Sequence, residues 1–233
     1  MPKLLYLGHG SLRLTADSGG IVYIDPFAGD DAGYAPAPDL VLITHEHGDH
    51  TDLSRLTPGD YPVIRAGDAL SDGQYATFTF RGGRLAGLVV RAVPAGGNSY
   101  HSTAECVGWL VQLDGVTVYV SGDTSWLDTM ASLRDVAGGR IDYALFCADG
   151  YYNMDPCEAA RCARDAGAVH NILYHMVPDA RELYDATIVG EWDAPGKLDL
   201  PAGTEIELTG GCDSAGRGQQ PTVAAGAAAA DSD

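Results

Sequence analysis

The stretch that decides the fold is Thr44-His45-Glu46-His47-Gly48-Asp49-His50, which places three imidazoles and the carboxylate of Asp49 within one short loop. It directly follows the apolar run from Asp39 to Ile43, which is typical of a buried strand. Three histidines in one loop cannot all be packed as neutral groups, because each needs its own hydrogen-bond partner. Imidazole ligands suit zinc, and an added carboxylate tolerates manganese or iron. The loop therefore predicts metal binding.

The spacing inside this loop favours two adjacent metal positions. His45 and His47 point the same way in an extended segment, because side chains alternate along such a chain. Asp49 and His50 lie beyond the turn at Gly48. A single ion reaches all four side chains only awkwardly, whereas two ions that share the loop would use them all. A solvated polar loop is the alternative.

Outward from the loop, the pattern predicts a strand-rich first half and an alternating second half. Strands are expected at 3–7, 11–15, 21–25, 39–43, 62–65, 75–80, 85–93, 107–113 and 116–120, with a short helix at 52–56. Asp114-Gly115 is a hairpin turn signal. Helices at 126–136 and 156–166 then alternate with strands at 143–146 and 169–174, before a last strand at 205–208. This order predicts a layered α+β architecture with sheets inside and helices outside.

Length and composition indicate one folded domain. The chain has 233 residues, of which 45% are hydrophobic and 20% charged, enough for a sizeable core. No linker interrupts residues 1–210, which we interpret as a single domain. Residues 211–233 are mostly Gly, Ala, Ser, Gln and Asp, and we expect this tail to be disordered.

Charge and cysteine content limit the partners. The formal net charge is −18, and Lys3 and Lys197 are the only lysines. An anionic surface repels phosphate backbones and anionic lipid, so we expect a small-molecule substrate and neither nucleic acid nor membrane as a partner. The five cysteines form an odd set without a CxxC pair, and no signal peptide or membrane span is visible. These features predict a cytoplasmic protein, and they do not indicate its oligomeric state.

Further motifs follow in a recognisable order. They are Leu7-Gly8-His9-Gly10-Ser11, Ile24-Asp25-Pro26-Phe27, Asn98-Ser99-Tyr100-His101, Ser121-Gly122-Asp123-Thr124, Met154-Asp155-Pro156 and Tyr174-His175. With the histidine loop, they make the chain resemble the metallo-β-lactamase superfamily of binuclear metallohydrolases. More narrowly, it is similar to a compact bacterial branch that includes ascorbate-phosphate lactonase-like and uncharacterised metal-dependent hydrolases. The resemblance implies a four-layer αββα sandwich. The chain departs from the family's pattern at Asp149, where relatives usually carry glycine.

The resemblance also implies a ligand set. The first metal site would consist of His45, His47 and His101, the second of Asp49, His50 and His175, with Asp123 bridging the two ions. The sequence supports two of these positions independently, because Asp123 and His175 each follow a predicted buried strand. His101 is assigned from the order of the motifs, and a polar loop residue is its alternative. His170 competes with His175, but it lies at the opposite end of its strand and is interpreted as a surface or packing histidine.

Several residues are expected to support the ligands or contact the substrate. Asp25 could accept the ring proton of a ligating histidine, or it could be a turn-forming aspartate. His9 could face the metals, or it could be a hydrogen-bonded structural histidine. The predicted pocket residues are Asn98, Tyr100, Tyr151, Tyr152 and Asn153. Arg181 is the one arginine considered for an anionic substrate, and a solvated loop charge is its favoured interpretation.

These assignments predict a hydrolase with two divalent metal ions, zinc first and manganese as the alternative. A metal-bridged hydroxide, oriented by Asp49, would attack the carbonyl or phosphoryl centre of a small-molecule ester, lactone or phosphodiester. One alternative is a non-catalytic metal-binding protein. Another is a di-iron redox protein on the same fold, although such relatives carry glutamate where this chain has His47.

Overall fold

The computed structural model describes residues 1–179, 182–211 and 223–224. Its strands are β1 (Lys3–Gly8), β2 (Ser11–Thr15), β3 (Ile21–Ile24), β4 (Leu40–Leu42), β5 (Val63–Ile64), β6 (Leu70–Ser71), β7 (Gln74–Tyr75), β8 (Thr77–Thr79), β9 (Val89–Pro94), β10 (Val107–Leu113), β11 (Val116–Val120), β12 (Tyr143–Cys147), β13 (His170–Tyr174), β14 (Glu205–Glu207) and β15 (Val223–Ala224). The α-helices are α1 (Ala66–Ala69), α2 (Leu133–Val136), α3 (Pro156–Ala166) and α4 (Ala186–Glu191). The 3-10 helices are η1 (Asp31–Tyr34), η2 (Gly48–His50), η3 (Leu53–Arg55), η4 (Gly83–Leu85) and η5 (Asp128–Ser132).

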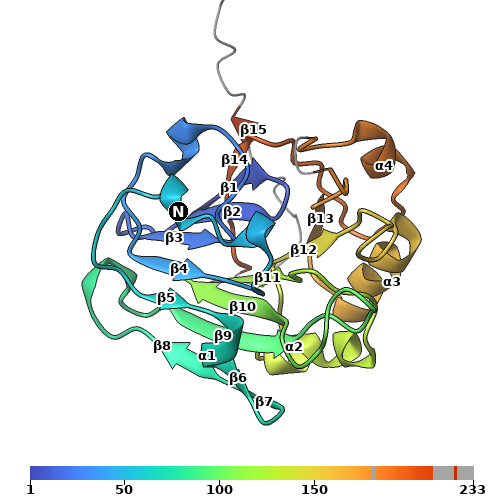
Figure 1. Cartoon of the computed structure of the whole chain (residues 1–233), viewed down its shortest axis with the longest axis horizontal. Helices are drawn as coiled ribbons and strands as arrows, with labels where there is room; N and C mark the ends of the chain where they lie inside the picture. The colour runs from blue at the N-terminus through green and yellow to red at the C-terminus, as the bar shows by residue number, and fades with distance from the viewer. Residues whose placement is uncertain (180–181, 212–222, 225–233) are drawn as a thin grey trace, which may run out of the picture.

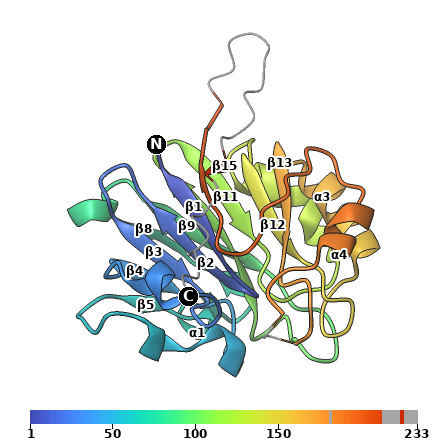
Figure 2. The ribbon, with the colours of Figure 1, turned by 90° about the horizontal axis from the view of Figure 1, so that it is seen from above.

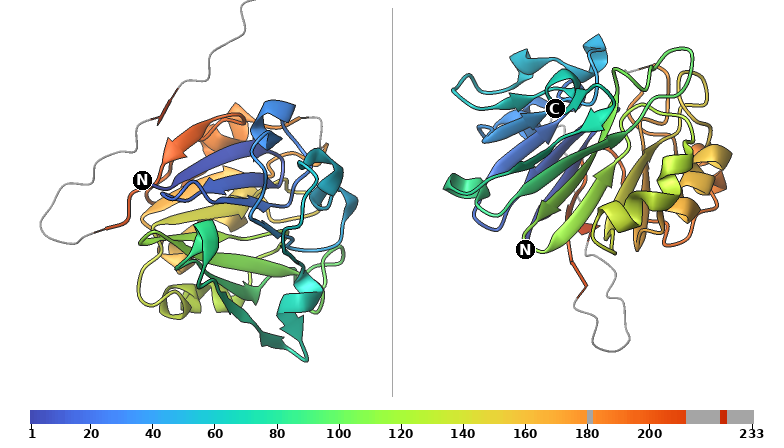
Figure 3. Two further views of the ribbon diagram at one scale, coloured as in Figure 1. Left: turned by 90° about the vertical axis from the view of Figure 1, so that its left-hand side faces the viewer. Right: turned by 90° about the horizontal axis from the view of Figure 1, so that it is seen from below.

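Two sheets form the centre of the molecule. One has the strand order β15-β14-β1-β2-β3-β4-β5, and the other has the order β13-β12-β11-β10-β9-β8. Figure 1 and Figure 2 show the two sheets side by side, with α3 and α4 on the outer side of the second sheet. The views in Figure 3 show the same layering. The predicted α+β architecture with sheets inside is confirmed.

Alternation along β1 shows how one strand serves two cores. Leu4 and Tyr6 are fully buried in the large core between the sheets, together with Trp109 of β10. Leu5 and Leu7 point the other way, as the two-residue period of a strand requires, into a smaller cluster on the outer face. Tyr34 of η1 belongs to that cluster. Short 3-10 segments thus cover the outer face of the first sheet, where the sandwich prediction implied a helical layer.

The helix predicted over 156–166 is confirmed as α3, because its start and stop signals are all present. The Asp155 side chain accepts a hydrogen bond from the Glu158 backbone N–H at 2.8 Å, and Pro156 occupies the first turn. Gly167 ends the helix in the left-handed conformation at φ 63°. The predicted turn at Asp114-Gly115 is also confirmed, since it joins the antiparallel strands β10 and β11.

Two predicted helices are wrong in extent. The segment predicted over 126–136 becomes η5 followed by α2, and Trp126 lies outside both. Contacts to α3 explain this, because the Trp126 backbone N–H donates to Glu158 Oε1 and its indole N–H donates to Asp165 Oδ2. The helix predicted over 52–56 is only the 3-10 turn η3, capped by Asp52.

The strands between 70 and 94 also differ from the prediction. The strand predicted over 75–80 is divided into β7 and β8. β9 begins only at Val89, because η4 ends at Leu85 and a turn follows at residues 86–87. The six-residue helix α4 was not predicted, and Asp185 caps it by accepting hydrogen bonds from the Thr187 and Ile188 backbone N–H groups.

The C-terminal prediction concerns residues of which few are described. The tail predicted to be disordered, 211–233, lies outside the described residues except for Gly211 and β15, and β15 pairs antiparallel with β14. Among the described helices, none is long and apolar enough to cross a membrane.

Candidate metal centre

The predicted ligands come from strand ends that meet between the two sheets. The loop with the three histidines follows β4, Asp123 follows β11, and His175 follows β13. β3 and β4 run parallel, as do β11, β12 and β13, so the carboxyl ends of these strands point toward the same edge of the sandwich. The carboxyl ends of parallel strands are a common place for functional side chains. His101 joins them from the loop between β9 and β10.

Asp123 lies at the centre of this group and is buried. Four histidine Nε2 atoms surround its carboxylate: His101 at 3.3 Å, His175 at 3.5 Å, His50 at 3.6 Å and His45 at 3.9 Å. All four histidines are buried. A carboxylate in this position can contact donor groups on both of its sides, as a bridging ligand requires.

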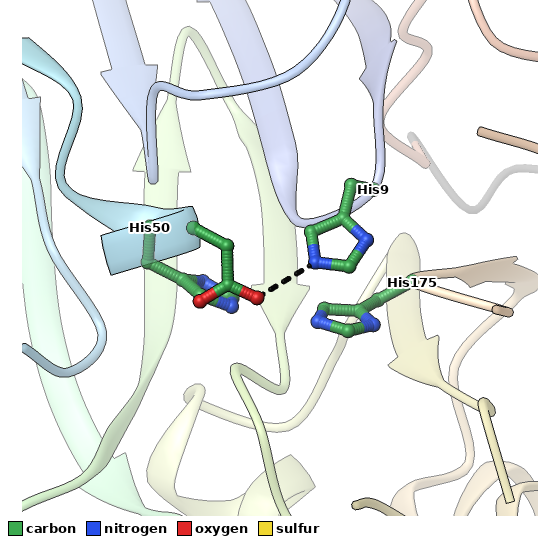
Figure 4. Close-up of side chains that lie close together, drawn as sticks. His9, His50 and His175 are labelled. Atoms are coloured by element: carbon green, nitrogen blue, oxygen red, sulfur yellow. Dashed lines mark hydrogen bonds and ion pairs between the residues drawn. The ribbon is translucent and has the colours of Figure 1, made fainter. Parts of the chain in front are cut away.

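The potential ligand atoms fall into overlapping sets. One contains His45, His47 and His101, the second contains His9, Asp49, His50 and His175, and the third contains His45, His50 and Asp123; within each, the ligand atoms lie within 4.8 Å of one another. Figure 4 shows His9, His50 and His175 of the second set with their rings around one space. The structure therefore brings together all seven predicted ligands, and it adds His9.

Asp25 organises two of the histidines from behind. It is fully buried, and its Oδ2 accepts hydrogen bonds from His50 Nδ1 at 2.9 Å and from the Thr44 hydroxyl at 2.6 Å. Because the Thr44 hydroxyl has a single hydrogen, it must accept from His45 Nδ1, which lies 3.0 Å away. In both rings Nδ1 is then the donating nitrogen, and Nε2 is the nitrogen that faces Asp123. This is the way outer carboxylates fix the tautomer of metal-binding histidines.

His9 holds Asp49 in place. Its Nε2 lies 3.0 Å from Asp49 Oδ2, with the carboxylate as acceptor, and its ring centroid lies 3.7 Å from that of His175. His9, Asp25 and His175 all have positive φ, between 44° and 49°. Residues other than glycine rarely adopt this backbone conformation, because it costs energy, and the exceptions cluster at functional sites.

Asp149 belongs to the surroundings of the centre, although it was not among the predicted site residues. Its side chain has no exposed surface, and Oδ2 lies 3.6 Å from His175 Nδ1. The same Oδ2 accepts a hydrogen bond of 2.7 Å from Asn153 Nδ2, which also donates to Asp123 Oδ2 at 2.9 Å. Asp149 thus lies behind His175 much as Asp25 lies behind His50, but at 3.6 Å it faces the ring nitrogen without a hydrogen bond. The sequence signal was the departure from glycine at this position.

Burial and the clustered charges shift the pKa values of these groups. Burial, then the nearby His50, lowers the pKa of His45 to about 2, and burial lowers the pKa of His175 to about 4. Burial opposes charge on His50 as well, but Asp123 and Asp25 outweigh it and raise the pKa of His50 to about 9. Burial also opposes charge on Asp123, yet the surrounding histidines hold its pKa well below the usual range.

The centre contains buried nitrogen and oxygen atoms that lack hydrogen-bond partners and could bind a divalent cation. The buried side-chain atoms that have no hydrogen-bond partner among the described residues include Nε2 of His45 and of His50, both ring nitrogens of His175, and Oδ1 of Asp123. A buried polar atom without a partner costs free energy, so such a concentration of unpaired nitrogen and oxygen atoms needs an explanation. Imidazole nitrogens and carboxylate oxygens in this arrangement are able to bind a metal ion.

The centre opens into a cavity of about 490 Å³. Its lining includes His47, Asp49, His101, Asp123 and His175, together with Ser99, Tyr100, Tyr152 and Pro178. Two predicted pocket residues, Tyr100 and Tyr152, therefore lie on the cavity wall.

The other predicted pocket residues lie around this wall. Asn98 accepts hydrogen bonds from the Tyr100 and His101 backbone N–H groups, both at 2.9 Å, and Asn153 is buried against Asp123. Tyr151 packs on Tyr100 and Tyr152. Arg181 lies outside the described residues. His170 lies at the start of β13, stacked on Tyr143 at a centroid distance of 4.9 Å and away from the centre.

Comparison with known proteins agrees with this geometry. Residues 3–168 match the family model of the beta-lactamase superfamily domain. The chain is 35% identical over 198 residues to a UPF0173 metal-dependent hydrolase of Methanoculleus marisnigri, covering 77% of this chain and 84% of that protein. It is 30% identical over 178 residues to one of Thermococcus kodakarensis, covering 69% and 78%. The metallo hydrolase Igni18 of Ignicoccus hospitalis shares the fold with a TM-score of 0.64 at 20% identity, over 89% of this chain and 99% of that one.

The chain belongs to the beta-lactamase superfamily and has the metallo-β-lactamase fold, which confirms the resemblance seen in the sequence. Within that superfamily it is a member of the UPF0173 metal-dependent hydrolases.

Proposed function

We propose that this chain is a binuclear metal-dependent hydrolase that cleaves a small-molecule ester, lactone or phosphodiester. His45, His47 and His101 would hold one ion, Asp49, His50 and His175 would hold the other, and Asp123 would contact both. Zinc is the first choice of metal and manganese the second, because the donors are mainly imidazole nitrogens.

One observation carries the proposal: four buried histidine Nε2 atoms surround the Asp123 carboxylate at 3.3–3.9 Å. Structural histidines normally donate and accept hydrogen bonds, but here the buried Nε2 atoms of His45, His50 and His175 have no hydrogen-bond partner among the described residues. Asp25 orients two of these nitrogens toward the centre. It contacts His50 directly and His45 through the Thr44 hydroxyl. This arrangement is costly for folding alone and well suited to ligation.

Two divalent ions in this centre would supply a water of lowered pKa and Lewis acidity toward the oxygen of the bond to be cleaved. Asp49 would orient that water, and the contact with His9 uses only its Oδ2. Burial opposes charge on Asp49, but the hydrogen bond from His9 and the nearby His50 hold its pKa well below the usual range. An ionised Asp49 can accept a proton or a hydrogen bond from the attacking water.

The cavity and the charge support a small substrate. A volume of about 490 Å³ is within the range of small-molecule sites. The net charge of −18 disfavours nucleic acid and anionic membranes as partners. A cytoplasmic location is part of the proposal, because the described cysteines, Cys106, Cys147, Cys157 and Cys162, are all unpaired.

Elemental analysis of the purified protein, followed by a panel of lactones, phosphodiesters and esters, tests the proposal. We expect about two zinc or manganese ions per chain and turnover of one substrate class. Asp49→Asn should retain the fold and lose turnover by about 100-fold or more. Iron with oxygen or peroxide chemistry would contradict the proposal, and so would a loaded centre that hydrolyses nothing in the panel.

A further inference from the structure

Three tyrosines gather at the mouth of the metal centre. The exposed fraction is 49% for Tyr100, 63% for Tyr151 and 40% for Tyr152. Among the described residues, the other large hydrophobic side chains that are exposed are Met1, Val136 and Val169, which come from separate parts of the chain. Half of the exposed large hydrophobic side chains of the described residues therefore lie together at the metal centre. Clustered exposed apolar side chains usually mark a binding surface.

The three rings pack against one another. Tyr100 stacks near Tyr151 at a centroid distance of 6.2 Å, and it meets Tyr152 edge-on at 5.0 Å. Tyr151 and Tyr152 also meet edge-on, at 4.6 Å. These distances and angles are the ones aromatic pairs prefer. Tyr151 supports the other two rings, while Tyr100 and Tyr152 line the cavity itself.

The backbone beneath each tyrosine is held by a side chain. Asn98 Oδ1 accepts from the Tyr100 N–H at 2.9 Å. Asp149 Oδ1 accepts from the N–H groups of Tyr151 and Tyr152 at 2.8 and 2.7 Å. The rings are therefore positioned before any ligand arrives, which reduces the entropy cost of binding.

Both loops are also part of the metal centre. Asn98 Oδ1 binds the N–H of His101 as well, and Asp149 is linked through Asn153 to Asp123. A ligand in the cavity would lie against Tyr100 and Tyr152 on one side and against Asp49, Asp123 and His175 on another. A planar ring and a hydrolysable group on one molecule can contact both parts together.

We infer that the tyrosine cluster of Tyr100, Tyr151 and Tyr152 binds an aryl or heteroaryl ring of the substrate, whose carbonyl or phosphoryl group then lies at the metal centre. This inference rests on the proposed function and specifies its substrate class. Offset or edge-to-face contacts with Tyr100 and Tyr152 select a flat ring over an alkyl chain of similar size. The preferred substrates are therefore aryl or heteroaryl esters, lactones fused to an aromatic ring, or aryl phosphodiesters.

Binding of two inert probes tests the inference without turnover. Phenylphosphonate and methylphosphonate carry the same anionic group and differ in the ring, and calorimetry can measure both on the zinc-loaded protein. We expect phenylphosphonate to bind at least about tenfold more tightly, because each aromatic contact is worth roughly two- to tenfold.

Variants assign that preference to the rings. Tyr152→Ala and Tyr100→Ala should each weaken phenylphosphonate about two- to tenfold and leave methylphosphonate within about twofold. Tyr152→Phe keeps the ring and should keep the preference. Val169→Ala removes an exposed apolar side chain elsewhere and is the matched control.

Equal affinity for the two probes in the unmodified protein would overturn the inference, and so would alanine variants that weaken both probes alike. A mass change of the alanine variants in sedimentation, with the phenyl preference intact, would also overturn it, because the tyrosines would then be a contact between chains. A clear phenyl preference without hydrolysis of any ester would support the tyrosine site and contradict the proposed hydrolase activity, so the two failures are distinguishable.

Discussion

Replacement of Asp149 by asparagine should separate the support of the metal centre from the ligands themselves. Asp149 Oδ1 accepts from the backbone N–H groups of Tyr151, Tyr152 and Asn153 at 2.8, 2.7 and 3.2 Å. Asparagine can still accept these bonds with its own oxygen. Its amide nitrogen would then take the place of Oδ2 and face the Asn153 amide group and His175 Nδ1, where the carboxylate oxygen now lies 2.7 and 3.6 Å away.

The magnitude follows from the change in hydrogen-bond type. Bonds to a charged acceptor are worth about 1.5–3 kcal/mol and neutral bonds about 0.5–1.5 kcal/mol, so each backbone bond should lose about 1 kcal/mol. Tyr151 and Tyr152 are exposed, and water compensates in part, so we expect the free energy of unfolding to fall by about 2 kcal/mol. For a chain of this size that corresponds to about 4–8 °C in Tm. Loss of the carboxylate behind His175 should weaken zinc binding by about 10–100-fold.

Two assays measure these effects. Urea unfolding of the metal-free protein reports the stability change, and competition with a chelator reports zinc affinity. Asp60→Asn, at an exposed aspartate, is the control for loss of one negative charge. Zinc affinity of Asp149→Asn within twofold of that control would refute the idea that Asp149 positions His175.

Three further predictions concern the same centre. Asp25→Asn should lower the free energy of unfolding by about 2–3 kcal/mol and weaken zinc binding about 10–100-fold, because Asp25 accepts one hydrogen bond from His50 and two from Thr44. Urea unfolding and chelator competition measure the two effects, and unchanged zinc affinity would contradict a role of Asp25 in orienting His50. Gly122→Ala should lower the free energy of unfolding by more than about 1 kcal/mol in the same assay and reduce the amount of bound metal, because Gly122 has φ +61° and a Cβ there would lie 2.9 Å from the Val107 carbonyl oxygen. Gly67→Ala is the control, since Gly67 has open space around it, and an equal effect of both substitutions would contradict this explanation. When the free ion is present at about 100 times its Kd, its removal by a chelator should lower Tm in a thermal scan by about 5–10 °C, and added zinc should restore the original Tm. An identical Tm with and without chelator would mean that no ion stabilises the fold.

Much of the fold is predictable where local signals agree with tertiary contacts. The cap at Asp155, the proline at position 156 and the glycine at 167 define α3 completely, and the Asp114-Gly115 turn defines the β10–β11 hairpin. The position of Trp126 outside the helices is not predictable in this way. Its two hydrogen bonds reach residues 32 and 39 positions further along the chain, and no local pattern contains them.

The candidate site divides in the same way. His45, His47, Asp49 and His50 are visible in the sequence because they lie together in one loop. Asp123 and His175 are suggested by the strands that precede them, whereas His101 depended on the order of motifs.

Asp149 was not predicted because its role depends on which residues lie near it in the folded structure. It contacts Asn153 locally, but the His175 ring that it faces is brought close only by the pairing of β12 with β13. Apart from the departure from the family's glycine, nothing in the sequence separates this buried loop aspartate from a turn former.

The central claim is that two metal ions flank Asp123, and anomalous X-ray scattering at the zinc edge from crystals of the zinc-loaded protein tests it most directly. We predict two peaks about 3.5–4 Å apart on either side of the Asp123 carboxylate, one beside His45, His47 and His101 and the other beside Asp49, His50 and His175. One peak alone, or peaks away from Asp123, would contradict the account.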